Sequence, residues 1–215
     1  MHRFLWYFSI FIGVFGLLGP ALAQPSERLD ALGALTSPQP ERRAQAVIVL
    51  GNEGRMADVP ALLERLRDEE PAVRALAEQA IWAVWSRSGD PEVDALFAQG
   101  VAEMQSGESS AAIATFTRVI ELKPDFAEGW NKRATVYFLV GDYQHSLADC
   151  AEVVRRNPNH FGVLAGYGQI YLHLEEFDKA LEYFRRALAV NPNLDGVRTI
   201  IEALEARARG KRQII

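Results

Sequence analysis

Residues 161–194 read FGVLAGYGQIYLHLEEFDKALEYFRRALAVNPNL. The run closes on Asn191-Pro192, and Pro124, Pro158 and Pro192 follow one another at a constant spacing of 34 residues. Counting back from each proline divides this part of the chain into units 93–126, 127–160 and 161–194. A period of this length indicates a repeat architecture, in which each unit is one supersecondary element.

Positions inside the units agree with one another, which supports the division. The eighth, fifteenth and twenty-fourth positions hold Gly100, Ala134 and Gly168, then Gly107, Gly141 and Glu175, then Phe116, Cys150 and Phe184. Small residues at the eighth position allow two helices to cross closely, and the fifteenth position falls in a turn between them. We therefore expect each unit to be a pair of antiparallel helices. Neither helix buries its face alone, so stacked neighbours create the core.

The units resemble tetratricopeptide (TPR) repeats, whose pattern is W-x2-L-G-x2-Y, A-x3-F, P on a 34-residue period. The third unit carries the resemblance best, with Leu164, Tyr167, Gly168, Tyr171, Ala180, Phe184, Ala187 and Pro192. The first unit departs most, with Gln99 and Glu103 at positions that are usually apolar or aromatic, as terminal repeats often do. The resemblance implies an all-α, right-handed helical superhelix whose work is to bind another protein.

Two further segments flank the units. Leu194, Val197, Ile201 and Leu204 form one apolar stripe, which predicts a cap helix in 195–215, near 195–208, followed by a basic tail. Residues 24–90 form a weaker repeat at an offset of 31, in which Pro40 and Arg43 align with Pro71 and Arg74. This segment resembles HEAT-like repeats, with four helices expected near 26–36, 41–51, 58–67 and 71–86. Trp82 and Trp85 are expected to pack it against the first unit as one continuous solenoid.

The first 23 residues have the pattern of an export signal. Arg3 precedes the apolar run 4–18, and Ala21-Leu22-Ala23 supplies small residues for cleavage before Gln24. We expect an exported, periplasmic or secreted protein, with the alternative that residues 4–22 stay as a membrane anchor. The formal net charge of −5 is mildly acidic, so nucleic acid is not an expected partner.

No catalytic constellation, cofactor motif or metal-ligand spacing stands out, so an enzyme is not expected. The histidines beyond residue 24 are His145, His160 and His173, and they fall on different helices or turns of the repeat register. Cys150 is expected to be a buried structural thiol, because its equivalents are Phe116 and Phe184. The alternative functions are an envelope enzyme with an unrecognised site and a self-associating structural module.

In TPR arrays the first helix of each unit lines a concave groove. The positions that correspond to groove contacts include Phe97, Val101, Met104, Asn131, Thr135, Phe138, Gly162, Gln169, Leu172 and His173. TPR domains that grip a C-terminal carboxylate place basic residues at positions that here hold Phe97, Gly162 and Gly166. The expected ligand is therefore an apolar or amphipathic peptide or protein segment. In the alternative reading, the N-terminal helices fill the groove or these residues serve packing alone. The sequence leaves the oligomeric state open.

Overall fold

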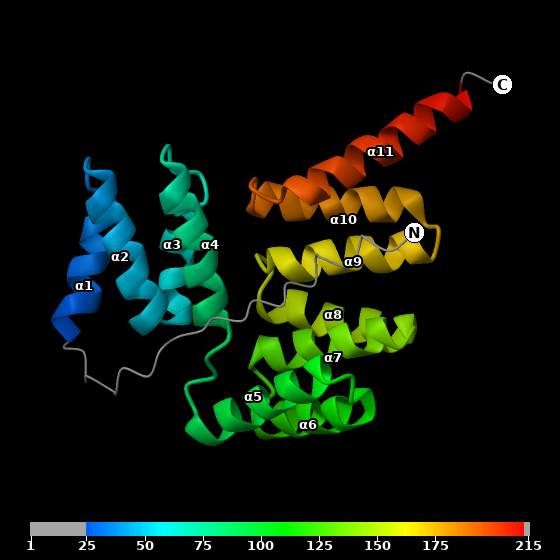
Figure 1. The fold of residues 1–215 in the computed structure, drawn as a ribbon, viewed down its shortest axis with the longest axis horizontal. Coiled ribbons are helices and arrows are strands. Elements are labelled where there is room, and N and C mark those ends of the chain that lie inside the picture. The colour runs from blue at the N-terminus through cyan, green and yellow to red at the C-terminus, as the bar shows by residue number, and fades with distance from the viewer. Residues whose placement is uncertain (1–24, 213–215) are drawn as a thin grey trace. The chain divides into compact units, whose positions relative to one another are not determined.

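The computed structural model describes residues 25–212, and within this range it consists of helices joined by short turns, with no strand (Figure 1). The predicted all-α class is therefore confirmed. The contacts separate a unit that ends at Arg87 from a unit that begins at Ser88. The predicted export signal lies outside the described residues.

From Pro25 to Arg87, the described part of the N-terminal unit contains four α-helices and one short 3-10 turn. These elements are α1 (Pro25–Ala34), α2 (Pro40–Glu53), η1 (Met56–Asp58), α3 (Val59–Arg65) and α4 (Pro71–Trp85). Prolines occupy the first turns of α2, α3 and α4, where a missing backbone N–H costs no hydrogen bond. Helix α2 packs between α1 and α4, and α3 packs on α4.

The offset of 31 in the sequence corresponds to a repeated loop contact. Nη1 of Arg43 donates hydrogen bonds to the carbonyl oxygens of Ser37 and Pro38, at 3.0 and 3.4 Å. Nη1 of Arg74 donates to the carbonyl oxygens of Asp68 and Glu69, at 2.8 and 3.1 Å. In each copy an arginine on the second helix closes the loop that precedes that helix. The likeness to HEAT repeats stays a prediction.

The C-terminal unit contains the three predicted pairs and one further helix. These are α5 (Pro91–Gln105), α6 (Ser109–Leu122), α7 (Ala127–Leu139), α8 (Tyr143–Arg156), α9 (Phe161–His173), α10 (Phe177–Val190) and α11 (Asp195–Arg212). Each pair packs internally, and α7, α9 and α11 also pack on the last helix of the pair before them (Figure 1). The apolar stripe of α11 (Val197, Ile201 and Leu204) is buried in the core it shares with α10.

Within each pair, a small residue on the first helix faces a core residue on the second. A Cβ atom added at Gly168 would lie 2.5 Å from the Cδ1 and Cε1 atoms of Phe184, and one added at Gly100 would lie 2.7 Å from Cε1 of Phe116. Both phenylalanines are fully buried. In the middle pair the first residue is larger than glycine and the second is smaller than phenylalanine, since Ala134 and Cys150 share its core cluster.

The turns within the pairs use a left-handed residue. Gly107 and Gly141 have φ angles of 78° and 81°, and Glu175 has a φ of 59° at the equivalent position. Glu175 is the one non-glycine residue with positive φ among the described residues. This conformation costs an L-residue about 1–2 kcal/mol. The third unit therefore accepts strain that the other two avoid.

Candidate functional site

The predicted groove residues of α5 lie mainly in packing contacts. The Phe97 ring is 7% exposed, and its centre lies 5.9 Å from that of Phe116 and 5.2 Å from that of Phe126. Val101 and Met104 are half-buried against the same core cluster. The first predicted groove segment therefore offers little free surface, because α5 turns its apolar side toward α6 and Phe126.

Two polar residues of α7 that were predicted to face a peptide backbone are engaged within the helix. Nδ2 of Asn131 donates to both carboxylate oxygens of Glu128, at 3.1 and 3.0 Å. The Thr135 hydroxyl donates to the carbonyl oxygen of Asn131 at 2.9 Å. Asn131 and Thr135 are both buried. Their role in contacting a partner stays a prediction.

A buried Glu128–His160 pair connects the first turn of α7 to the N-cap of α9, and the repeat pattern of the sequence did not predict it. The side chains of Glu128 and His160 are 1% and 0% exposed, and Oε1 of Glu128 lies 2.6 Å from Nε2 of His160. Nδ1 of His160 accepts the backbone N–H of Val163 at 3.1 Å and so caps the N-terminus of α9. Because Nδ1 acts as an acceptor, we assign the proton to Nε2, which donates to Glu128.

The charge state of Glu128 follows from these contacts. Burial is the largest single influence on the Glu128 pKa and opposes ionisation, but the hydrogen bond and electrostatic interaction with His160, the charge of Lys132 and the hydrogen bond from Asn131 together outweigh it. The net result lowers the pKa of Glu128 from 4.5 to about 2. The carboxylate is therefore ionised at neutral pH and holds α7 against the start of α9.

An aromatic cluster lies where the second and third units meet. The ring centre of Phe138 lies 5.7 Å from that of Tyr143 and 5.2 Å from that of His173, and the Tyr143 and His173 rings stack at 5.6 Å. Next to Phe138 in sequence, Leu139 is 50% exposed. We define the α7–α9 patch as Phe138, Leu139, Tyr143, Leu172 and His173. The sequence predicted Phe138, Leu172 and His173 as groove residues.

The other residues of α9 that were considered in the sequence precede Leu172 and His173 in the helix. Gly162 and Gln169 are half-buried, and Gly166 is buried. Leu172 is half-buried and packs against the core cluster of the third unit and α11. His173 is exposed. Of the ten predicted groove residues, only His173 is exposed; Phe97, Asn131 and Thr135 are buried and the other six are half-buried.

In the described part of the chain we looked for a metal site, a reactive thiol and a membrane-spanning helix. No group of three or more His, Cys, Asp or Glu residues there has an arrangement that suits a metal ion. Cys150 is buried as expected, and burial raises the pKa of its thiol from 9.0 to about 12, so it is a poor nucleophile. None of the described helices combines the length and apolar character needed to cross a membrane.

The comparisons with known proteins identify the repeats. The family model described as tetratricopeptide repeat matches residues 97–160 and 168–194. A TPR repeat-containing protein of Rhizobium etli is 28% identical over 162 residues, which cover 73% of this chain and 79% of that protein. Hsp70-Hsp90 organizing protein 1 of Glycine max is 26% identical over 156 residues, which cover 70% of this chain but only 26% of that protein.

Solved structures show the same fold. The first TPR of Spaghetti (RPAP3), bound to the HSP90 peptide SRMEEVD, superposes with a TM-score of 0.52 at 19% identity, over 54% of this chain and 93% of that one. The Sgt2 TPR domain from Aspergillus fumigatus gives a TM-score of 0.54 at 20% identity, over 58% of this chain and 83% of that domain.

Proposed function

We propose that this chain, whose residues 97–160 and 168–194 are tetratricopeptide repeats, is an exported scaffold that binds an apolar or amphipathic segment of another protein. The observation that carries this proposal is the α7–α9 patch. It joins the rings of Phe138, Tyr143 and His173 from two repeats, and Leu139, which follows Phe138 in the sequence, is 50% exposed. Exposed apolar side chains that gather in one place on a folded protein commonly mark a binding surface.

The chemistry of this surface favours an apolar ligand over an acidic chain terminus. The position of one basic clamp residue holds Phe97, which is buried in the core, and the other two hold Gly162 and Gly166. No cation therefore stands at these three positions. The Spaghetti domain carries an HSP90 peptide, which supports peptide binding as a property of this fold. Binding to our chain would rest on side-chain anchors at the α7–α9 patch, as in helix-in-groove recognition.

The test compares two exposed leucines. A peptide selected from a random library on the wild-type protein is titrated against each variant by fluorescence anisotropy. Leu139→Asp should weaken the Kd at least tenfold, because it places a charge beside the aromatic cluster. Leu122→Asp alters a leucine that is 38% exposed at the end of α6 and should leave the Kd unchanged. Equal effects of the two substitutions would show that the peptide does not use the α7–α9 patch.

Export is the second part of the proposal and rests on residues 1–23. Mass spectrometry of the protein recovered from the cell envelope reports its first residue. A chain that begins at Gln24 supports cleavage. An intact N-terminus in the membrane fraction supports the anchor formed by residues 4–22, and an intact chain in the cytosol contradicts export.

A further inference from the structure

Three exposed apolar side chains lie at the C-terminal ends of α7 and α9. Leu139 is 50% exposed, Val140 is 51% exposed and Leu174 is 39% exposed. Val140 and Leu174 are the C-cap residues of the two helices. The ring centres of His173 and Phe138 lie 5.2 Å apart, so the two helix ends are neighbours (Figure 1). We call Leu139, Val140 and Leu174 the turn-edge residues.

Glu175 follows directly after Leu174, is exposed and is strained. Its φ angle is 59°, whereas glycine occupies the equivalent turn position in the other two units, at Gly107 and Gly141. Glycine adopts this conformation without the steric cost that a glutamate incurs. Stability therefore does not explain a glutamate here, and its carboxylate is available for another role.

The turns that follow α7 and α9 carry a surplus of negative charge. Residues 139–145 and 172–179 contain four carboxylates and one lysine. A second cation, Arg207 of α11, lies nearby, since its Cζ is 4.5 Å from the centre of the Phe177 ring. With histidine counted as neutral and both cations included, two negative charges remain in surplus.

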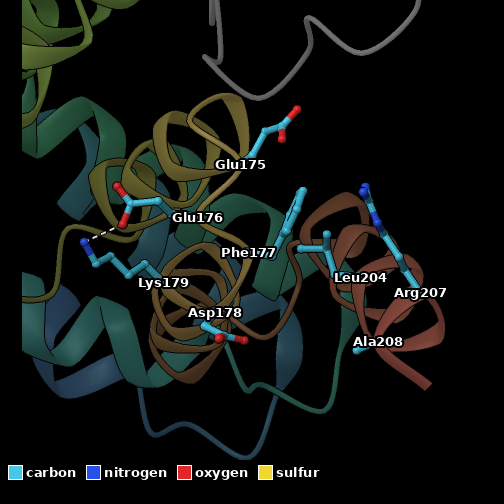
Figure 2. Close-up of a pocket in the computed structure, with 8 residues that line it drawn as sticks. All are labelled: Glu175, Glu176, Phe177, Asp178, Lys179, Leu204, Arg207 and Ala208. Atoms are coloured by element: carbon cyan, nitrogen blue, oxygen red, sulfur yellow. Dashed lines mark ion pairs between the residues drawn. The ribbon is translucent and has the colours of Figure 1, made fainter. Parts of the chain in front are cut away.

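Glu175 differs from two neighbouring carboxylates in its contacts. Glu176 pairs with Lys179 at 2.5 Å. Asp142 pairs with His145 at 2.6 Å. No ion pair within the described part of the chain includes Glu175, and Figure 2 shows its side chain pointing away from Lys179. Its charge can therefore meet a cation from another molecule.

Apolar surface is present on both sides of Glu175 in the sequence. Before it comes Leu174, and after it comes a cleft of about 450 Å³ between the start of α10 and α11, which Glu175 itself lines (Figure 2). Phe177 and Leu204 supply the apolar wall of this cleft. Apolar and acidic surface therefore alternate across the turn between α9 and α10.

We propose that the segment bound at the α7–α9 patch is basic and amphipathic, with its apolar side on the turn-edge residues and a lysine or arginine facing Glu175. This proposal rests on the proposed function, because it names the partner of the same surface. An acidic segment would bring like charges together, and complementary charge selects between partners. The contact is exposed, so one charge pair changes affinity by up to about fivefold, and added salt reduces the effect.

Two labelled probe peptides test the charge preference. One is an amphipathic helix of leucine and lysine, and the other has glutamate in place of every lysine. In fluorescence anisotropy titrations, the Kd of the lysine peptide should be about tenfold lower than that of the glutamate peptide. Glu175→Gln should weaken binding of the lysine peptide about threefold, and Glu175→Lys about tenfold. Both effects should shrink in high salt.

Matched variants separate this contact from general charge and from folding. Asp125→Asn removes an exposed carboxylate from the turn between α6 and α7 and should leave the Kd unchanged. Glu175→Gly should weaken binding as Glu175→Gln does, but it should raise the midpoint of urea unfolding, because it relieves the left-handed strain. A glutamate that stabilised the turn would lower this midpoint when replaced.

Leu139→Ser distinguishes failure of this inference from failure of the proposed function. It removes an apolar contact without adding charge, and it should weaken binding of the lysine peptide. If it does so while the Glu175 variants leave the Kd unchanged, only the charge inference is wrong. If Leu139→Ser also has no effect, the proposed function fails with it.

Three further outcomes would overturn the inference. The first is an equal Kd for the two peptides, and the second is a lysine peptide that does not bind at up to about 1 mM. The third is a dimer of the wild-type chain that Leu139→Ser dissociates, measured by sedimentation equilibrium. It would identify a second copy as the occupant of this surface.

Discussion

Replacing Cys150 with phenylalanine should destabilise the C-terminal unit by about 3 kcal/mol, and adding Ala134→Gly should restore most of that loss. Cys150 is 3% exposed and shares a core cluster with Ala134. Overpacking a filled core typically costs about 1–3 kcal/mol, and occasionally more. The third helix pair shows how a phenylalanine is accommodated at this position. There the residue facing the ring is glycine, and a Cβ at Gly168 would lie only 2.5 Å from the Phe184 ring. Glycine at residue 134 opens the same space.

Urea unfolding of the two single variants and the double variant measures the effect. The double-mutant cycle should show a coupling free energy of about 2 kcal/mol or more in favour of the pair. Ala134→Gly alone should cost about 1 kcal/mol, since glycine is a poorer helix residue. As a control, Ala148→Phe adds the same side chain at an exposed position of α8 and should change stability by less than about 0.5 kcal/mol. Strictly additive single effects would contradict the proposed complementarity.

The helices of the C-terminal unit can be predicted from the sequence because their ends depend on residues that lie close to them in the chain. A proline every 34 residues and a glycine in two of the three turns limit where helices begin and end, and the three pairs follow the predicted units, except that α5 begins at Pro91, two residues before the unit 93–126. Glu175 takes the turn position of Gly107 and Gly141 and has the same left-handed backbone conformation. The same pattern also predicted that Cys150 would be buried, since burial follows from repeat register.

The candidate site is less predictable, because the position of a residue within the repeat does not specify which other side chains it contacts. Position five of a unit is a groove position by analogy, yet Phe97 lies within 6 Å of two aromatic rings and joins the core. Asn131 occupies the same position in the next unit, and its amide is held by Glu128. Phe97 and Asn131 therefore have different surroundings, which depend on the identity of the neighbouring side chains. A period in the sequence does not carry this information.

The Glu128–His160 pair illustrates the limit most clearly. The two residues lie 32 positions apart, and each is polar, so the apolar pattern of the repeat passes over both. The available signal was the position of His160 immediately before the predicted helix of the third unit, where a side-chain acceptor caps the backbone. The carboxylate of Glu128, at the start of the same unit, is the partner of the other ring nitrogen. The chain thus joins α7 to α9 through a buried polar contact.

Substituting Glu128 with glutamine should remove an acid-dependent part of the stability of the C-terminal unit. The pKa of Glu128 is lowered to about 2 in the folded protein, against 4.5 without these contacts. A carboxyl with a lowered folded pKa stabilises the fold above the unfolded pKa and loses that contribution as the pH falls toward the folded pKa. The difference of 4.5 − 2 corresponds to about 3 kcal/mol, present above pH 5 and lost progressively toward pH 2.

Urea unfolding of the wild type and the variants between pH 7 and pH 3, with hydrogen exchange of α7 and α9 as a local probe, measures this contribution. Wild-type stability should fall more steeply than that of Glu128→Gln below pH 5, so that the two curves converge. Glu121→Gln alters an exposed carboxyl on α6 and should follow the wild type. His160→Asn retains an acceptor for the Val163 N–H but removes the donor to Glu128, and should cost about 2–3 kcal/mol at pH 7. Parallel curves for wild type and Glu128→Gln would show that the pair does not hold α7 to α9 through its charge.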